Sequence, residues 1–191
     1  EWNHSKDKFS CSLGLKANRV HFSNISINKS YYNFLPKAML GYRLNENSFI
    51  RYDVEMSQTN PTLVELTDTE IRLDPYLAER GNLLLKPYSN LNNNLFYEHK
   101  KGLFTFNANL RHHYKHNPIM ESVKEQGNIF LIIPENMKSW NKYNAEMNLK
   151  VGMIKNILQF SLTGGYNHFN SQGNNYSHEY SNFYYSANVL A

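Results

Sequence analysis

The sequence predicts an all-β protein, an antiparallel up-and-down meander of about eight strands. Two observations support this fold class. Apolar and polar residues alternate in many stretches, which places apolar side chains on one face of a strand and polar side chains on the other. Aromatic residues, which favour pleated surfaces, make up 14% of the chain, with 14 Tyr and 11 Phe among 191 residues.

The alternation places the expected strands in order along the chain. They cover residues 9–18, 34–43, 50–56, 90–97, 104–114, 144–153, 158–167 and 183–189. The third strand is the clearest, because its polar face carries only charged residues, Arg51, Asp53 and Glu55. Charges of both signs are costly in a dry core, where each needs a buried partner, so we expect this face to be wet.

The connections between these strands alternate between long and short. The long ones are 23–32, 59–88, 117–140 and 169–180, and the short ones are 44–47, 99–102 and 154–156. In an up-and-down meander every second connection lies at the same end, so the tight turns gather at one end and the long loops at the other. This asymmetry is typical of outer-membrane β-barrels. About ten residues per strand, at a rise of about 3.3 Å and a tilt near 45°, also span an apolar band of about 25 Å.

Two of the long connections contain patterns of their own. In the loop 59–88, Asp74 as N-cap and Pro75 at the first helical position predict a helical turn that ends before Gly81. In the loop 117–140, the apolar run 129–133 is either an extension of a strand or a plug inside the loop.

Proline and glycine also punctuate the expected strands. Pro36 lacks an N–H, so we expect it near the start of its strand or at a bulge. Gly164 and Gly165 lie inside a strand pattern and predict a bend or a bulge there.

The end of the loop 59–88 resembles a known motif. The stretch 81–87, Gly-Asn-Leu-Leu-Leu-Lys-Pro, is similar to the Gly-Asn-Pro-x-Leu-Lys-Pro-Glu segment in the barrels of TonB-dependent outer-membrane receptors. Leu83 stands where proline is usual and Tyr88 where glutamate is usual. The matching positions are Gly81, Asn82, Leu85, Lys86 and Pro87. Segments 33–36, 40–46 and 60–63 resemble the same family in order and spacing, so the resemblance spans roughly residues 9 to 153.

The resemblance implies a receptor that transports an iron chelate, vitamin, glycan or peptide across the outer membrane of a Gram-negative bacterium. In that family a plug domain fills a barrel of about 22 strands. Residues 1–191 would then be a single internal segment of the barrel, without the plug. The implied partners are outer-membrane lipid, a plug domain, TonB and an unknown solute, with no cofactor.

Charged residues on the polar faces are candidates for the barrel lumen. They are Arg51, Asp53, Glu55, Arg111, Glu146 and Lys150. They either contact a plug or a passing solute, or form a lattice of mutually compensating charges, which is expected in a polar lumen.

A histidine-rich stretch raises the possibility of a metal site. On a strand His112 and His116 share a face, and His113 points to the other. No carboxylate or cysteine completes a ligand set with these residues and their neighbours Tyr114 and Lys115 at a recognised spacing. We therefore expect polar residues at the rim of a strand and no metal.

Composition and motifs argue against other functions. The formal net charge is +4 and the basic residues are scattered, whereas a nucleic-acid-binding face is clustered. Cys11 is the one cysteine, so no internal disulfide can form. No apolar run is long enough for a transmembrane helix, and no signal peptide is visible. Asp74 and Glu79 have no nucleophile or paired acid nearby, so we expect no enzyme.

Two alternatives remain open on the sequence. One is a complete small barrel of about eight strands with a structural or adhesive role, in which the first expected strand pairs with the last. The other is a soluble β-domain that binds a ligand.

Overall fold

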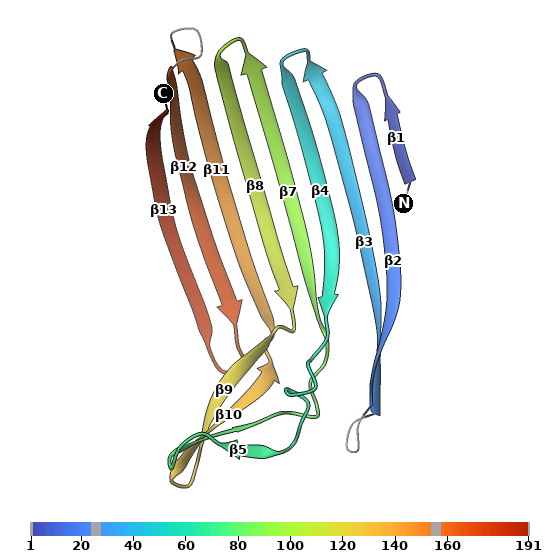
Figure 1. Ribbon diagram of the computed structural model, residues 1–191, viewed down its shortest axis with the longest axis vertical. Coiled ribbons are helices and arrows are strands. Elements are labelled where there is room, and N and C mark those ends of the chain that lie inside the picture. Colours follow the sequence, from blue (N-terminus) through green and yellow to red (C-terminus); the bar gives the residue numbers. More distant parts are fainter. Residues whose placement is uncertain (1, 24–27, 154–157, 191) are drawn as a thin grey trace.

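The chain folds into two β-sheets (Figure 1). The computed structural model describes residues 2–23, 28–153 and 158–190. A main sheet has nine strands in the order β1-β2-β3-β4-β7-β8-β11-β12-β13, and a second sheet has four in the order β5-β6-β10-β9. The part of the chain that the structure describes contains no helix long and apolar enough to span a membrane.

All neighbours in the main sheet are antiparallel. Its strands are β1 (Trp2–Lys6), β2 (Phe9–Ser23), β3 (Asn28–Asn45), β4 (Ser48–Thr59), β7 (Tyr88–Lys101), β8 (Phe104–His116), β11 (Ser139–Met153), β12 (Leu158–Gln172) and β13 (Ser177–Leu190). The predicted all-β, up-and-down meander is therefore confirmed, with β1 as an additional short strand at the edge.

The strands are longer than the alternation predicted. From β2 to β13, the strands of the main sheet contain 12 to 18 residues. The expected long connections 23–32 and 169–180 are mostly strand, because β3 begins at Asn28 and only residues 173–176 separate β12 from β13. At these ends both faces carry polar or aromatic residues, so the period of two fades although the backbone ladder continues. The expected turn at 154–156 lies outside the described residues.

The two longest connections form the second sheet. The first contributes β5 (Glu70–Arg72) and β6 (Leu77–Arg80), and the second contributes β9 (Ile119–Gln126) and β10 (Ile129–Asn136). Strands β6 and β10 pair in parallel, so the two connections are joined by backbone hydrogen bonds. We call these two connections, residues 60–87 and 117–138, the loop body. It lies beyond one end of the main sheet in Figure 1.

The prediction of a helical turn from Asp74 to Gly81 is wrong. The Asp74 carboxylate accepts a hydrogen bond from the Tyr76 N–H two residues on, which makes a turn that leads into β6. A helical turn lies earlier instead, where the Leu66 N–H donates to the Thr62 carbonyl. A capping box starts it, because Glu65 accepts from the backbone N–H of Thr62 and Thr62 Oγ1 accepts from that of Glu65.

The apolar run 129–133 is neither an extension of a main-sheet strand nor a plug. It forms most of β10, in the interior of the second sheet. Leu131 and Ile133 are buried there with Ala78, and Leu66 and Leu85 form a second buried cluster next to Phe22. The buried core thus lies in and around the loop body, whereas both faces of the main sheet remain accessible.

Pro36 and the glycine pair also differ from expectation. Pro36 lies in the interior of β3, one residue beyond the last pair of the β3–β4 ladder, Lys37 with Glu55, so only β2 pairs with this part of β3. A strand with one neighbour tolerates the missing N–H. Of the bend or bulge predicted at Gly164 and Gly165, the bulge is wrong, because both residues lie in regular register with β11 and β13. The bend stays a prediction.

The main sheet is open within the described residues. Strand β13 pairs with β12 alone, and β2, the first expected strand, pairs with β1 and β3. The described strands therefore lack the pairing of first and last strands that a closed eight-stranded barrel requires.

Candidate functional site

The two faces of the main sheet differ in chemistry. The cross-strand register aligns the odd-numbered residues of β4, β8 and β12 with the even-numbered residues of β7, β11 and β13. This face carries the charged and amide side chains, and we call it the polar face. The opposite face carries exposed Leu, Met, Phe and Tyr side chains, and we call it the apolar face.

Aromatic side chains on the apolar face gather towards both ends of the strands. Near the tight turns they are Phe9, Tyr42, Tyr97 and Phe104, and near the loop body they are Tyr32, Tyr114 and Tyr143. Between the two groups lie aliphatic residues such as Met147 and Leu162, which are 61% and 43% exposed, together with further aromatic residues such as Tyr166, Phe183 and Tyr185. An apolar band between two aromatic girdles is the surface that a membrane-spanning β-barrel presents to lipid.

The charged residues predicted for a lumen all lie on the polar face. Arg51 Nε is 2.8 Å from Asp53 Oδ2 on β4, and Arg111 Nη2 on β8 is 3.9 Å from Glu146 Oε1 on β11. Glu55 lies opposite Lys37 in the register of β3 and β4. Lys150 lies nearer the tight turns and lines a small hollow with Glu146. The structure therefore pairs Arg51 with Asp53 and Arg111 with Glu146, whereas Glu55 and Lys150 pair with no other member of the predicted set.

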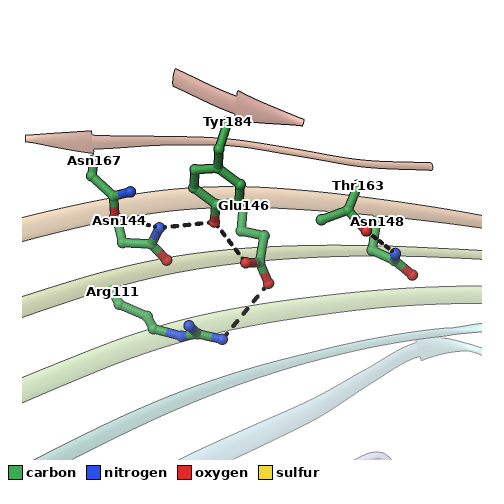
Figure 2. Close-up of polar contacts among 7 residues, drawn as sticks. All are labelled: Arg111, Asn144, Glu146, Asn148, Thr163, Asn167 and Tyr184. Atoms are coloured by element: carbon green, nitrogen blue, oxygen red, sulfur yellow. Dashed lines mark hydrogen bonds and ion pairs between the residues drawn. The ribbon is translucent and has the colours of Figure 1, made fainter. Parts of the chain in front are cut away.

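A polar network around Glu146 joins side chains of four strands, β8, β11, β12 and β13 (Figure 2). The Tyr184 hydroxyl on β13 donates a 2.6 Å hydrogen bond to Glu146 Oε2 on β11. The Asn144 amide donates to the Tyr184 hydroxyl at 3.2 Å and to Asn167 Oδ1 at 3.0 Å. With Arg111 on its other side, the Glu146 carboxylate links β8, β11 and β13 across β12.

Gly165 allows the Tyr184 side chain on β13 to extend past β12 and reach Glu146 on β11. Gly165 on β12 lies directly opposite Tyr184, and a Cβ atom at this position would overlap the tyrosine ring. The ring therefore lies flat over the glycine, and its hydroxyl reaches a strand beyond its neighbour. A Cβ atom at Gly164 would meet nothing within 4 Å, because this residue faces the other way.

Asparagine residues are the part of the site that the sequence prediction missed. The polar face has a hollow with a volume of about 780 Å³. The Asn residues that line it include Asn92, Asn94, Asn109, Asn144 and Asn167. An amide both donates and accepts hydrogen bonds, so rows of Asn form a hydrogen-bonding surface with no net charge. The signal was present in the sequence for β7, where Asn90, Asn92 and Asn94 recur at every second position.

A second group of side chains lies on the polar face near the loop body. His113 packs edge-on against Trp140 with ring centroids 5.0 Å apart, and Trp140 packs against Phe169 at 5.3 Å. Lys115 Nζ lies 4.9 Å from the Trp140 ring centroid. Lys142 lies on β11 two residues from Trp140 and lines the hollow. We call His113, Lys115, Trp140, Lys142 and Phe169 the basic–aromatic patch.

The histidines of the stretch 112–116 have different surroundings. His112 lies on the apolar face and stacks on Tyr143 with centroids 4.5 Å apart, while His113 belongs to the patch on the polar face. Across the described ranges 2–23, 28–153 and 158–190, no three His, Cys, Asp or Glu side chains are grouped to hold a metal ion.

The motif residues Gly81, Asn82, Leu85, Lys86 and Pro87 lie within the loop body, where they hold its parts together. The Asn82 N–H donates to the Glu65 carbonyl at 2.6 Å, and its side-chain amide donates to the Pro134 carbonyl at 3.0 Å. Leu85 is buried against Leu66.

Hydrogen bonds between the Asn136 side chain and backbone groups also hold the two connections of the loop body together. The Asn136 side chain accepts from the Lys86 N–H at 2.8 Å and donates to the Lys86 and Asn117 carbonyls at 2.9 and 2.8 Å. A Cβ at Gly81 would overlap the backbone of Glu65 and Thr67, so only glycine fits there.

Comparison with known proteins gives a family match over the full length of the chain. The model of the "Outer membrane protein beta-barrel family" matches residues 1–191. No curated protein sequence matches the chain.

Among solved structures, the siderophore receptor PirA from Pseudomonas aeruginosa is similar, with a TM-score of 0.66 and 14% identity over 95% of this chain and 38% of the receptor. A variant of the ferric enterobactin receptor PfeA from Pseudomonas aeruginosa, in complex with enterobactin, has a TM-score of 0.65 and 14% identity over 96% of this chain and 31% of the receptor. At this identity the likeness is one of fold. The chain spans about a third of the length of these receptors.

Proposed function

This protein belongs to the outer membrane protein beta-barrel family, and we propose that it is the barrel segment of a TonB-dependent receptor that takes up an anionic solute, specifically a ferric chelate. The family places the chain in the outer membrane of a Gram-negative bacterium, with its apolar face against lipid. The polar face then lines the barrel interior.

The observation that carries the proposal is the basic–aromatic patch. Lys115 Nζ lies over the Trp140 ring, and Lys142 lies opposite Phe169 in the register of β11 and β12, on the face that lines the interior. Cations attract an anionic solute, and aromatic faces provide apolar contact area without losing much side-chain entropy. The patch lies at the end of the strands nearest the loop body, so an incoming solute meets it first if the long loops face outward.

The network around Glu146 supports a different part of the same function. Arg111 compensates the charge of Glu146, and Tyr184 donates a hydrogen bond to the same carboxylate. The surrounding amides can bind both hydrogen-bond donors and acceptors. Such a surface suits contact with a plug domain, whose backbone and side chains need matched hydrogen bonds. Binding and passage, rather than chemical conversion of the solute, are the proposed activity, so we propose no enzymatic role. Energy would come from TonB acting on the plug.

The choice of a ferric chelate draws support from the similar structures, which are receptors for a siderophore and for ferric enterobactin. We therefore expect iron-limited cells that produce the protein to take up radioactive ferric enterobactin, and to stop doing so when TonB is deleted.

Charge removal in the patch tests which surface binds the chelate. The double variant Lys115→Gln/Lys142→Gln should raise the concentration for half-maximal uptake about tenfold, the expected effect of two exposed ion pairs. Lys100→Gln is the matched control, because Lys100 is exposed on the same sheet at the tight-turn end and should leave uptake unchanged. Equal uptake by all three proteins would reject the patch, and uptake that persists without TonB would reject the energy-coupled mechanism.

A further inference from the structure

We propose that a groove in the loop body binds an extended, cationic amphipathic peptide. The groove has a volume of about 740 Å³, within the range of ligand sites, and lies between the segment 64–69 and one face of the second sheet. This site is separate from the polar face and takes a ligand of opposite charge, so it goes beyond solute uptake.

The floor of the groove is an apolar row interrupted by one carboxylate. Glu79 on β6 lies between Ile71 on β5 and Ile132 on β10 in the register of the second sheet. Val64 forms part of the opposite wall and is 76% exposed. The surface thus offers contacts for aliphatic side chains with a negative charge at its centre.

The charges that line the groove favour a cation. Glu65 is engaged in the capping box with Thr62, and Arg80 lies 3.9 Å from Asp68. The side-chain carboxylates of Glu79 and Glu121 have no hydrogen-bond or ion-pair partner within the ranges that the structure describes. The groove therefore keeps two uncompensated carboxylates in a chain whose net charge is +4.

A free sheet edge next to the groove favours a peptide over a small cation. Strand β9 contributes Met120 and Glu121 to the groove, and among the described strands it pairs with β10 alone. Its other edge runs for eight residues and can add a strand through backbone hydrogen bonds. Alternate side chains of an added strand point to the same face, so apolar and basic residues can enter the groove together.

The groove is formed before any ligand arrives. The segment 64–69 forms one wall of the groove, and the Asn82 N–H, which follows β6, donates a hydrogen bond to the Glu65 carbonyl in this wall. Leu66, behind the wall, is buried. A preformed site loses little conformational entropy on binding. If the long loops face outward, the groove opens to the external medium, so the peptide reaches it from outside the cell.

Binding of a defined probe tests the proposal. The probe is a fluorescent peptide of alternating Leu and Lys, and its anisotropy is followed with outer-membrane vesicles from cells that produce the protein. The double variant Glu79→Gln/Glu121→Gln should bind the peptide about tenfold more weakly, as expected for the loss of two exposed ion pairs. Val64→Ser, on the exposed wall, should weaken binding about threefold by removing apolar contact.

Glu46→Gln is the matched control, because Glu46 is an exposed carboxylate in the tight turn between β3 and β4, at the opposite end of the main sheet from the groove. It should bind within twofold of the unaltered protein. Equal binding by the Glu79/Glu121 variant would overturn the proposal. The proposal would also be overturned if spermidine competed with the probe as strongly as unlabelled peptide does. The site would then bind small cations in general and not a peptide. Ferric enterobactin uptake should be unchanged in the Glu79/Glu121 variant, which separates this test from that of the proposed function.

Discussion

At the residue scale, glycine allows longer side chains to lie across the polar face. Gly165 makes room for the ring of Tyr184, and Gly41 makes room for the Ser10 hydroxyl and the edge of the Phe49 ring. An aromatic ring that covers a cross-strand glycine restores the packing that the missing side chain gives up. At Gly165 the arrangement also aims the Tyr184 hydroxyl at Glu146, so one small residue determines a hydrogen bond between two other strands.

We predict that Gly165→Ala lowers the free energy of unfolding by about 1–3 kcal/mol, because the new methyl group displaces the Tyr184 ring and breaks the hydrogen bond from its hydroxyl to Glu146. The neighbouring Gly164→Ala is the control, since its methyl group would meet nothing within 4 Å. It should be neutral or stabilise by up to about 0.5 kcal/mol through the unfolded state. Urea unfolding in phospholipid vesicles measures both, and equal midpoints for the two variants would contradict the role assigned to Gly165.

At the element scale, two connections separated by β7 and β8 fold as one body. The parallel pairing of β6 with β10 supplies the backbone link, and Asn136 adds hydrogen bonds to Lys86 and Asn117. A loop tied to another loop loses less entropy on binding than one that is ordered by its ligand. The pairing therefore explains how connections this long can present a preformed surface.

We predict that Asn136→Ala loosens this body without unfolding the main sheet. Three hydrogen bonds to backbone groups are lost, which costs about 2–3 kcal/mol locally. Amide hydrogen exchange should accelerate in residues 82–87 and 129–136 and stay unchanged in β11 and β12. Asn128→Ala, an exposed residue in the β9–β10 turn, serves as the control and should alter neither region. Acceleration that spreads equally over the main sheet would show that the loop body is not a separate unit.

At the scale of the whole molecule, the main sheet separates two solvents. Its apolar face carries aliphatic and aromatic side chains, with aromatic residues near both ends of the strands, and its polar face carries ion pairs and amides. Because one face of these strands contacts lipid and the other contacts water, neither face needs to be buried in a protein core. The small buried core accordingly lies in and around the loop body, where apolar residues meet away from lipid.

We predict that Met147→Arg destabilises the protein by about 2–4 kcal/mol in lipid vesicles, because Met147 lies midway along β11 on the lipid-facing side. Asn107→Arg on the polar face should cost less than about 1 kcal/mol, since the interior is wet and Glu98 lies opposite in the register. Reversal of the two effects, measured by refolding into vesicles, would mean that the faces are assigned the wrong way round.

Strand alternation was enough to predict the meander and the side on which each charged residue lies. Arg51, Asp53 and Glu55 share a face because side chains in a strand have a period of two, which is a local property. The pairing of Arg111 with Glu146, and the reach of Tyr184 over Gly165, could not be predicted, because they depend on which strands are neighbours and in what register.

The sequence by itself determined the class of the protein: alternating strands, two unlike faces, and tight turns at the end of the sheet opposite its two longest connections. Only the tertiary structure decided what the long connections do. Asp74 and Pro75 favour a local helical start, yet the adjacent segment becomes β6 because β10, far along the chain, offers it hydrogen bonds and a buried apolar surface. Local propensity is weak compared with such long-range pairing, so the loop body, its groove and the free edge of β9 became visible only once the chain was folded.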